Sequence, residues 1–225
     1  DYYDCLYYMA KMQEFYQDNA AGFHIVEPKA IWKLYTETAY EMDSFYRHFH
    51  YAFGNSLKNS NVLLEDKLKH SAEYVEALYQ NWYLKELTGC WTNAISENLS
   101  SLGYVSEIGK QHDFYPRYVR PLAGKNSRAF VIISDALRYE VAAELCDTII
   151  RTTKGTAKLD AVQSIFPSIT KFGMANLLPG RKLSVTEDME VLVDGQHSRS
   201  TPEREKILCS GNPNSVAVQY TDVLN

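Results

Sequence analysis

The sequence has 225 residues, of which 45% are hydrophobic and 13% aromatic, a content that excludes an intrinsically disordered chain. Its net charge of −5 does not indicate a nucleic-acid-binding or membrane-surface protein. No signal peptide is visible, and no apolar run approaches the roughly 20 residues of a membrane-spanning helix. The chain begins at Asp1 rather than at a methionine, so we expect it to be part of a longer protein.

Residues 1–108 are predicted to form a helical region. Apolar residues recur at spacings of three and four from Leu6 to Tyr16. A second helix is predicted from Pro28, a favoured first-turn residue, to Phe53, with Gly54 as its end. A third pattern runs from Val62 to Leu87.

Tyrosines are concentrated in this region, since 15 of the 17 lie before residue 120. Two interpretations are open. The aromatic side chains could form a surface on which bases stack, or they could fill the seams of a helical bundle. The helical spacing and the absence of neighbouring basic clusters favour packing within a bundle.

Residues 109–127 are punctuated by Gly109, Pro116, Pro121 and Gly124, which is typical of a linker or connecting segment. Strand and helix patterns alternate after it. This alternation predicts an α/β domain over residues 128–225 with a largely parallel sheet. The predicted strands are Ala129–Ile133, Thr156–Ile165, Glu190–Val193 and Ser215–Tyr220, and the predicted helices are Arg138–Thr152 and Lys171–Leu178.

The four cysteines lie far apart, at positions 5, 90, 146 and 209. None belongs to a C-x-x-C pair, which excludes zinc-finger and thioredoxin-like motifs. Widely spaced thiols fit free cysteines in a reducing cytoplasm.

Asp135 stands where an α/β sheet places its ligands, directly after a predicted strand and before a predicted helix. A carboxylate at this position is suited to bind a metal ion. It is equally suited to cap the helix that follows.

A second polar position follows the next predicted strand. Thr170 lies at the predicted start of a helix, where its hydroxyl could cap the helix or act as a nucleophile if a metal ion lowers its pKa. Ser168 is the competing hydroxyl. The pairing of Asp135 with Thr170 at successive strand ends is more specific than either residue alone.

These motifs resemble the PglZ domain, a member of the alkaline phosphatase superfamily that acts in BREX defence of bacteria against phage. The resemblance covers roughly residues 128–225. It rests on S-D-A-L-R-Y-E at 134–140, F-P-S-I-T-K-F-G-M at 166–174, L-L-P at 177–179, V-D-G at 193–195 and R-E-K-I-L at 204–208.

The resemblance implies a site of two metal ions, usually zinc in this superfamily, that catalyses phosphoryl transfer. Asp135 would be a metal ligand, and Thr170 would be the nucleophile and a second ligand. Arg138 and Lys171 could contact the phosphate, although Arg138 is equally suited to a structural ion pair. Asp194 and His197 form a D-x-x-H pattern in a polar segment that we interpret as a surface insertion rather than as a ligand pair.

The full-length protein is thus expected to be a metal-dependent phosphoric ester hydrolase of the bacterial cytoplasm, acting with other BREX proteins. The alternative is an inactive scaffold that docks partner proteins through its helical region. Direct nucleic-acid binding is not supported by this segment. We expect the segment alone to be inactive and to hold no metal ion tightly, because catalytic zinc sites use about three protein ligands.

Overall fold

The computed structural model describes residues 1–58, 62–123 and 127–223. Residues 124–126 of the predicted connecting segment, and residues 224–225, lie outside this description. The chain divides into two compact units, residues 1–101 with 137–160, and residues 102–136 with 161–225. Each unit is described by itself below.

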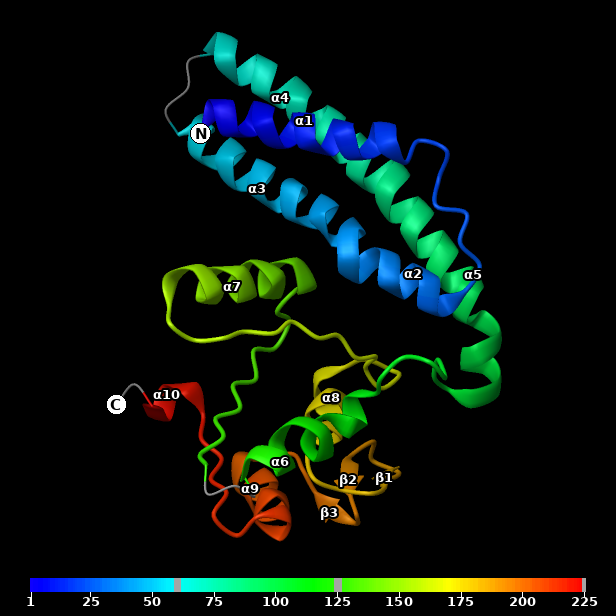
Figure 1. Cartoon of the computed structure of the whole chain (residues 1–225), viewed down its shortest axis with the longest axis vertical. Helices are drawn as coiled ribbons and strands as arrows, with labels where there is room; N and C mark the ends of the chain where they lie inside the picture. The colour runs from blue at the N-terminus through cyan, green and yellow to red at the C-terminus, as the bar shows by residue number, and fades with distance from the viewer. Residues whose placement is uncertain (59–61, 124–126, 224–225) are drawn as a thin grey trace. The chain divides into compact units, whose positions relative to one another are not determined.

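The first unit is helical, as the sequence predicts (Figure 1). A continuous helical segment starts at Pro28, and another starts at Val62. Its elements are α1 (Tyr2–Asp18), α2 (Pro28–Leu34), η1 (Tyr35–Ala39), α3 (Tyr40–Leu57), α4 (Val62–Glu76), η2 (Ala77–Leu84), α5 (Lys85–Leu102) and α7 (Tyr139–Thr152), where η1 and η2 are π-helical.

The predicted end of the second helix was wrong. Gly54 lies inside α3, which continues to Leu57. A glycine ends a helix by adopting a positive φ, and Gly54 does not have one, so it only weakens the helix locally.

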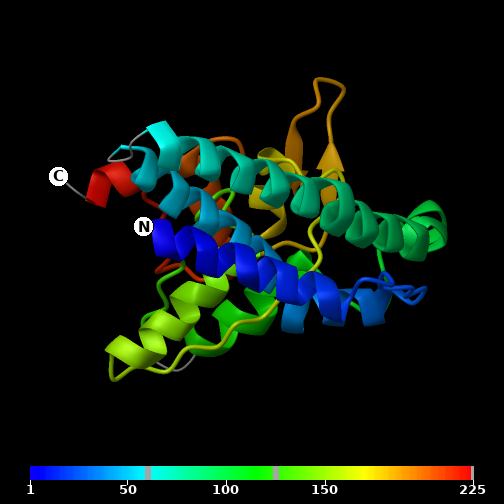
Figure 2. The same cartoon turned by 90° about the horizontal axis from the view of Figure 1, so that it is seen from above.

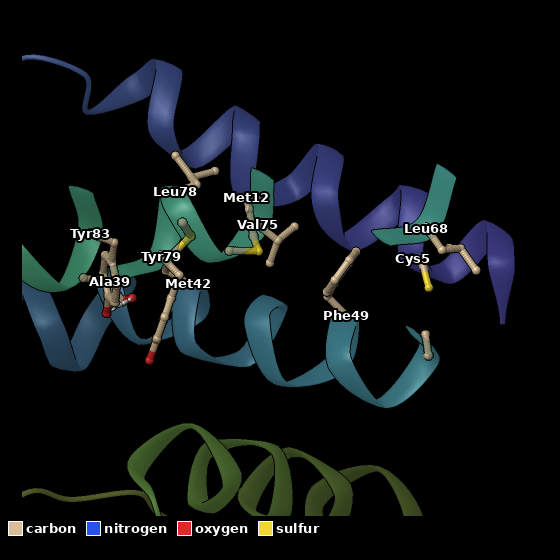
Figure 3. Packing of buried hydrophobic residues seen from close by; sticks show 11 residues of the cluster. Cys5, Met12, Ala39, Met42, Phe49, Leu68, Val75, Leu78, Tyr79 and Tyr83 are labelled. Carbon is tan, nitrogen blue, oxygen red and sulfur yellow. Dashed lines mark hydrogen bonds between the residues drawn. The ribbon is translucent and has the colours of Figure 1, made fainter. Parts of the chain in front are cut away.

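The core of the first unit lies between α1, α3 and the helix formed by α4 and η2, which run side by side in both views (Figures 1 and 2). Side chains from these helices point toward one another, as Figure 3 shows. The buried cluster is Cys5, Met12, Ala39, Met42, Phe49, Ala52, Leu68, Val75, Leu78, Tyr79 and Tyr83. Packing within a helical bundle is therefore confirmed for Phe49, Tyr79 and Tyr83, whereas several other tyrosines of this region are exposed.

The second unit combines short helices with a small sheet. Its core cluster is formed by Phe172, Ala175, Leu178, Val191, Val193 and Ile207. The elements are η3 (Gln111–Asp113), η4 (Tyr115–Val119), α6 (Arg120–Ala123), α8 (Thr170–Asn176), β1 (Leu183–Val185), β2 (Val191–Val193), β3 (Gln196–His197), α9 (Thr201–Gly211) and α10 (Tyr220–Val223).

A helical region followed by a region of mixed helices and strands is confirmed, but the sheet is antiparallel within the described residues. Its order is β1-β2-β3, with Leu183 opposite Val193 and Val193 opposite Gln196. The predicted strand at Glu190–Val193 corresponds to β2. The described part of the chain contains one parallel pairing, an isolated bridge between Lys110 and Gln163.

The other three predicted strands were wrong. Residues 156–165 form no strand, and their one β-pairing in the described chain is the isolated bridge at Gln163. Residues 129–133 are not paired with any described segment, and Phe130 and Ile132 are 84% and 92% exposed. Residues 215–219 are also unpaired, and Tyr220 begins α10. An apolar β-branched run becomes a strand only when a neighbouring strand supplies its hydrogen bonds, and local sequence does not reveal that neighbour.

Candidate active site

Asp135 lies in a tight turn that follows the extended segment 129–133. Its Oδ1 accepts a hydrogen bond of 3.0 Å from the backbone N–H of Ala136. Ala136 has a φ of +59°, which is uncommon for a residue other than glycine. Such conformations cluster at functional sites. The turn presents the carboxylate of Asp135 to solvent.

Thr170 is the first residue of α8, which begins close to where the sequence predicts a helix. Its Oγ1 donates a hydrogen bond of 3.0 Å to Oδ2 of Asp135. The structure therefore brings together the two residues singled out from the sequence, although 35 positions separate them. Within the described residues, the competing hydroxyl of Ser168 makes no such bond to Asp135.

Helix α8 is held in place beneath Thr170 by both apolar and polar contacts. Phe172 and Ala175 are buried in the core of the second unit. At the other end of α8, the side-chain oxygen of Asn176 lies 3.2 Å from Nδ1 of His112. These contacts fix the helix that carries the Thr170 hydroxyl.

Gln163 binds the backbone of residues 105–108 within the same unit, a role that no motif in the sequence indicates. Its side-chain Nε2 donates to the carbonyl oxygens of Val105 and Ile108 at 2.7 and 2.6 Å. Its Oε1 accepts from the backbone N–H of Val105 at 2.8 Å. A single glutamine forms no motif, so the structural role of Gln163 can be recognised only from its tertiary contacts.

Lys171 is exposed next to Thr170. Its Nζ donates a hydrogen bond of 2.8 Å to the carbonyl oxygen of Met189. The predicted contact between Lys171 and a phosphate stays a prediction.

Arg138 belongs to the first unit and is paired there. Its Nε lies 3.2 Å from Oε1 of Glu140, and its Nη2 lies 3.8 Å from Oδ1 of Asp43. These contacts are the structural ion pairs that the sequence left open as one alternative. A role of Arg138 in binding substrate stays a prediction.

Asp194 and His197, which lie at the β2–β3 turn and on β3, contact different partners. The carboxylate of Asp194 accepts hydrogen bonds from the backbone N–H groups of Arg181 and Lys182 at 2.9–3.1 Å. Nδ1 of His197 lies 3.1 Å from Oε2 of Glu190. These contacts agree with the interpretation that the D-x-x-H pattern is part of a surface segment.

The described residues contain no group of three or more His, Cys, Asp or Glu side chains that could hold a metal ion. Asp135 and Thr170 supply two adjacent oxygen donors, a chemistry suited to a divalent cation. The pair fits part of a metal site, but the donors needed for a whole one are not found among the described residues.

The carboxylate of Asp135, in a turn, beside the hydroxyl of Thr170, at a helix start, is the chain's candidate functional site. Residues 114–225 match a family model described as "BREX system PglZ alkaline phosphatase-like domain". This segment therefore belongs to the class of alkaline phosphatase-like domains. The chain belongs, through residues 114–225, to the PglZ family.

Two curated relatives are similar over nearly the whole chain. "Alkaline phosphatase-like protein PglZ" of Bacillus cereus (strain H3081.97) is 35% identical over 98% of this chain and 25% of its own length. "Alkaline phosphatase-like protein BrxZ" of Escherichia coli O9:H4 (strain HS) is 34% identical over 99% of this chain and 26% of its own length. The chain thus spans about a quarter of each relative. No solved structure gives a significant match.

Within the described residues, no helix is both long and apolar enough to cross a membrane.

Proposed function

We propose that the protein carrying this sequence is a metal-dependent phosphoric ester hydrolase of a bacterial BREX defence system. Thr170 is the nucleophile in this proposal, and Asp135 is a metal ligand. The observation that carries it is the 3.0 Å hydrogen bond between Thr170 Oγ1 and Asp135 Oδ2, in a segment that matches an alkaline phosphatase-like family.

The hydrogen bond orients the hydroxyl for attack on phosphorus. As the bond from Thr170 Oγ1 to phosphorus forms, the hydroxyl proton passes to Asp135 Oδ2 and then to water. The ester P–O bond breaks, and the leaving alkoxide takes a proton from solvent. Attack by water on the resulting phosphothreonine releases phosphate and restores the hydroxyl, so the cycle is balanced.

Asp135 and Thr170 are the residues of this chain that would hold a divalent cation, which the family resemblance suggests is zinc. When bound, such a cation lowers the pKa of a hydroxyl and neutralises charge on the phosphoryl oxygens. The described residues contain no group of three or more His, Cys, Asp or Glu side chains that could supply the remaining ligands.

The test is hydrolysis of nitrophenyl phosphate and of a nitrophenyl diester by the full-length protein, with and without Zn²⁺. We expect Thr170→Ala and Asp135→Asn each to lower kcat by about a thousandfold or more. Ser168→Ala is the matched control, because it removes a hydroxyl two positions away and should keep wild-type rates. Full activity in the Thr170 and Asp135 variants would rule out the proposed site.

The partners in this proposal are other BREX proteins, which the words "BREX system" in the family description support. The bacterial cytoplasm is the location that we propose for them. A second candidate function is docking of such partners by the first unit. It is favoured by the side chains of Tyr3, Tyr7 and Tyr51, which are exposed on α1 and α3. Partners that co-purify with the Asp135→Asn variant, in a protein without bound metal or activity, would favour the docking role over hydrolysis.

A further inference from the structure

A buried polar side chain ends helix α8, at the opposite end from the candidate nucleophile. Thr170 and Asn176 are the first and last residues of this helix, and Asn176 is 5% exposed. Each helical residue adds about 1.5 Å and about 100°, so the two side chains lie about 9 Å apart along the axis and about 120° apart around it. The Asn176 amide is therefore buried on a different side of the helix from the exposed Thr170 hydroxyl.

Both polar groups of the Asn176 amide have partners on η3. Its Oδ1 lies 3.2 Å from Nδ1 of His112, and its Nδ2 donates to Oε1 of Gln111 at 3.4 Å. A carboxamide oxygen can only accept, so Nδ1 of His112 carries the proton of this bond. Because Nδ1 is a donor in that neutral tautomer and also in the charged imidazole, the bond persists in both protonation states of His112.

The short helix η3 is itself fixed within the second unit. The backbone N–H of Gln111 donates to the carbonyl oxygen of Gln163 at 2.9 Å, and the N–H of Gln163 donates to the carbonyl oxygen of Gly109 at 2.8 Å. The side chain of Gln163 also binds the backbone just before η3. His112 therefore reaches Asn176 from a backbone frame that does not belong to α8.

The rotation of α8 about its axis decides whether the Thr170 hydroxyl reaches Asp135. The apolar contacts of Phe172 and Ala175 hold the helix against the core, but such contacts are non-directional. The hydrogen bonds to Asn176 are directional and specify the angle. A side-chain oxygen about 5 Å from the axis moves about 0.9 Å for a rotation of about 10°, which exceeds the tolerance of about 0.5 Å of an O–H···O bond.

We propose that His112 is a positioning residue for Thr170. Through its bond to the Asn176 amide it sets the rotation of α8, and so keeps the Thr170 hydroxyl 3.0 Å from Asp135 Oδ2. All of these contacts lie within the second unit. The inference rests on the proposed function, because it assigns His112 a role at the same site. It also gives a use to a histidine and a buried amide that take no part in the chemistry.

The test variant is the double substitution His112→Leu with Asn176→Leu. It removes both partners of the bond, so neither is left buried and unpaired, and the free energy of unfolding should change little. His112→Asn is the conservative variant, because its amide N–H stands close to the position of the imidazole Nδ1. Ser198→Ala is the matched control, since it removes another buried hydrogen bond of the second unit, from Ser198 Oγ to the Val191 carbonyl oxygen at 2.9 Å.

One readout needs no turnover. The backbone N–H of Ala136 donates to Oδ1 of Asp135, whose Oδ2 accepts from Thr170. When Thr170 shifts, the carboxylate loses one of its two bonds, and amide exchange of Ala136 should become about threefold faster or more. Thr170→Ala gives the size of this effect. The double variant should match it, whereas His112→Asn and Ser198→Ala should keep wild-type exchange.

The second readout is the kinetics of the full-length protein. The double variant should lower kcat by about tenfold or more and change KM less than about twofold, because a displaced nucleophile affects the chemical step. His112→Asn and Ser198→Ala should retain most of the wild-type kcat. A histidine with a structural role alone would change the denaturation midpoint without this loss of kcat.

Wild-type Ala136 exchange in the double variant would overturn the proposal. An equal loss of kcat in His112→Asn would also overturn it, by assigning chemistry to the imidazole itself, and so would a raised KM with an unchanged kcat, by assigning His112 to substrate binding. The exchange measurement decides the positioning role even when Thr170→Ala disproves the hydrolase. If the double variant fails to fold, His112→Gln gives the same outcomes, since its amide lies one bond farther from the backbone.

Discussion

Replacing Asp43 by alanine tests how strongly one buried carboxylate stabilises the first unit. The change leaves the hydroxyls of Tyr35 and Tyr79 without the acceptor that they contact at 2.9 and 2.7 Å. Hydrogen bonds to a charged group contribute about 1.5–3 kcal/mol each, so the two bonds together give about 3–6 kcal/mol. Tyr83 loses little, because its hydroxyl also donates to the Ala39 carbonyl at 2.8 Å.

Part of this loss is offset because the variant no longer has to bury the charged carboxylate of Asp43. We therefore expect Asp43→Ala to lower the free energy of unfolding by about 3–5 kcal/mol. Asp43→Asn is the matched control, since it keeps the shape and one carbonyl acceptor. It should cost about half as much.

Tryptophan fluorescence during denaturant unfolding is a suitable assay. Trp32, Trp82 and Trp91 all belong to the first unit, so the signal follows that unit alone. A loss below about 1 kcal/mol for Asp43→Ala would refute the idea that the tyrosine–carboxylate cluster organises the unit.

Three further predictions concern the rest of the chain. Burial raises the pKa of Tyr35, Tyr79 and Tyr83, and burial together with Glu76 raises the pKa of Tyr46 to about 12. Because these pKa values are raised, their stabilising contribution is complete below about pH 10 and is lost as the pH rises through them. Absorbance titration should show these hydroxyls ionising only together with unfolding, and their ionisation in a folded protein below about pH 11 would contradict this. Ser200→Ala removes the oxygen that caps α9 and should lower the free energy of unfolding of the second unit by about 1 kcal/mol. Circular dichroism during denaturation measures this loss, and an unchanged denaturation midpoint would argue against the cap. Asp194→Ala should speed amide exchange of Arg181 and Lys182, because it removes the carboxylate that ties the segment before β1 to the β2–β3 turn, and should leave zinc affinity in the full-length protein unchanged. A fall in that affinity with unchanged exchange would instead make Asp194 a ligand.

Local signals in the sequence predicted several features well. Pro28 marked a helix start, and the hydroxyl of Thr170 was placed at the start of another helix. Asp135 was predicted to follow a strand that the structure does not contain, but the structure does place its carboxylate within hydrogen-bond distance of the Thr170 hydroxyl. Each of these depends on residues close in sequence or on the ordinary ends of secondary-structure elements.

Features that depend on distant partners could not be predicted. Arg47 pairs with Glu144, which lies 97 positions away in the sequence, and no local pattern predicts that contact. The exposed run 129–133 has strand-like composition, but strand formation depends on a neighbour that composition does not identify. One local signal was missed, since Asp194–Gly195 has positive φ at both residues, as a tight hairpin turn requires.

The most direct test of the central assignment is to trap the covalent intermediate. Full-length protein is mixed with nitrophenyl phosphate and Zn²⁺, quenched in acid and digested, and the peptide that contains both hydroxyls is sequenced by mass spectrometry. The account predicts a phosphoryl group on Thr170, which persists in Ser168→Ala and disappears in Thr170→Ala. A phosphoryl group on Ser168, or turnover that continues without Thr170, would contradict it.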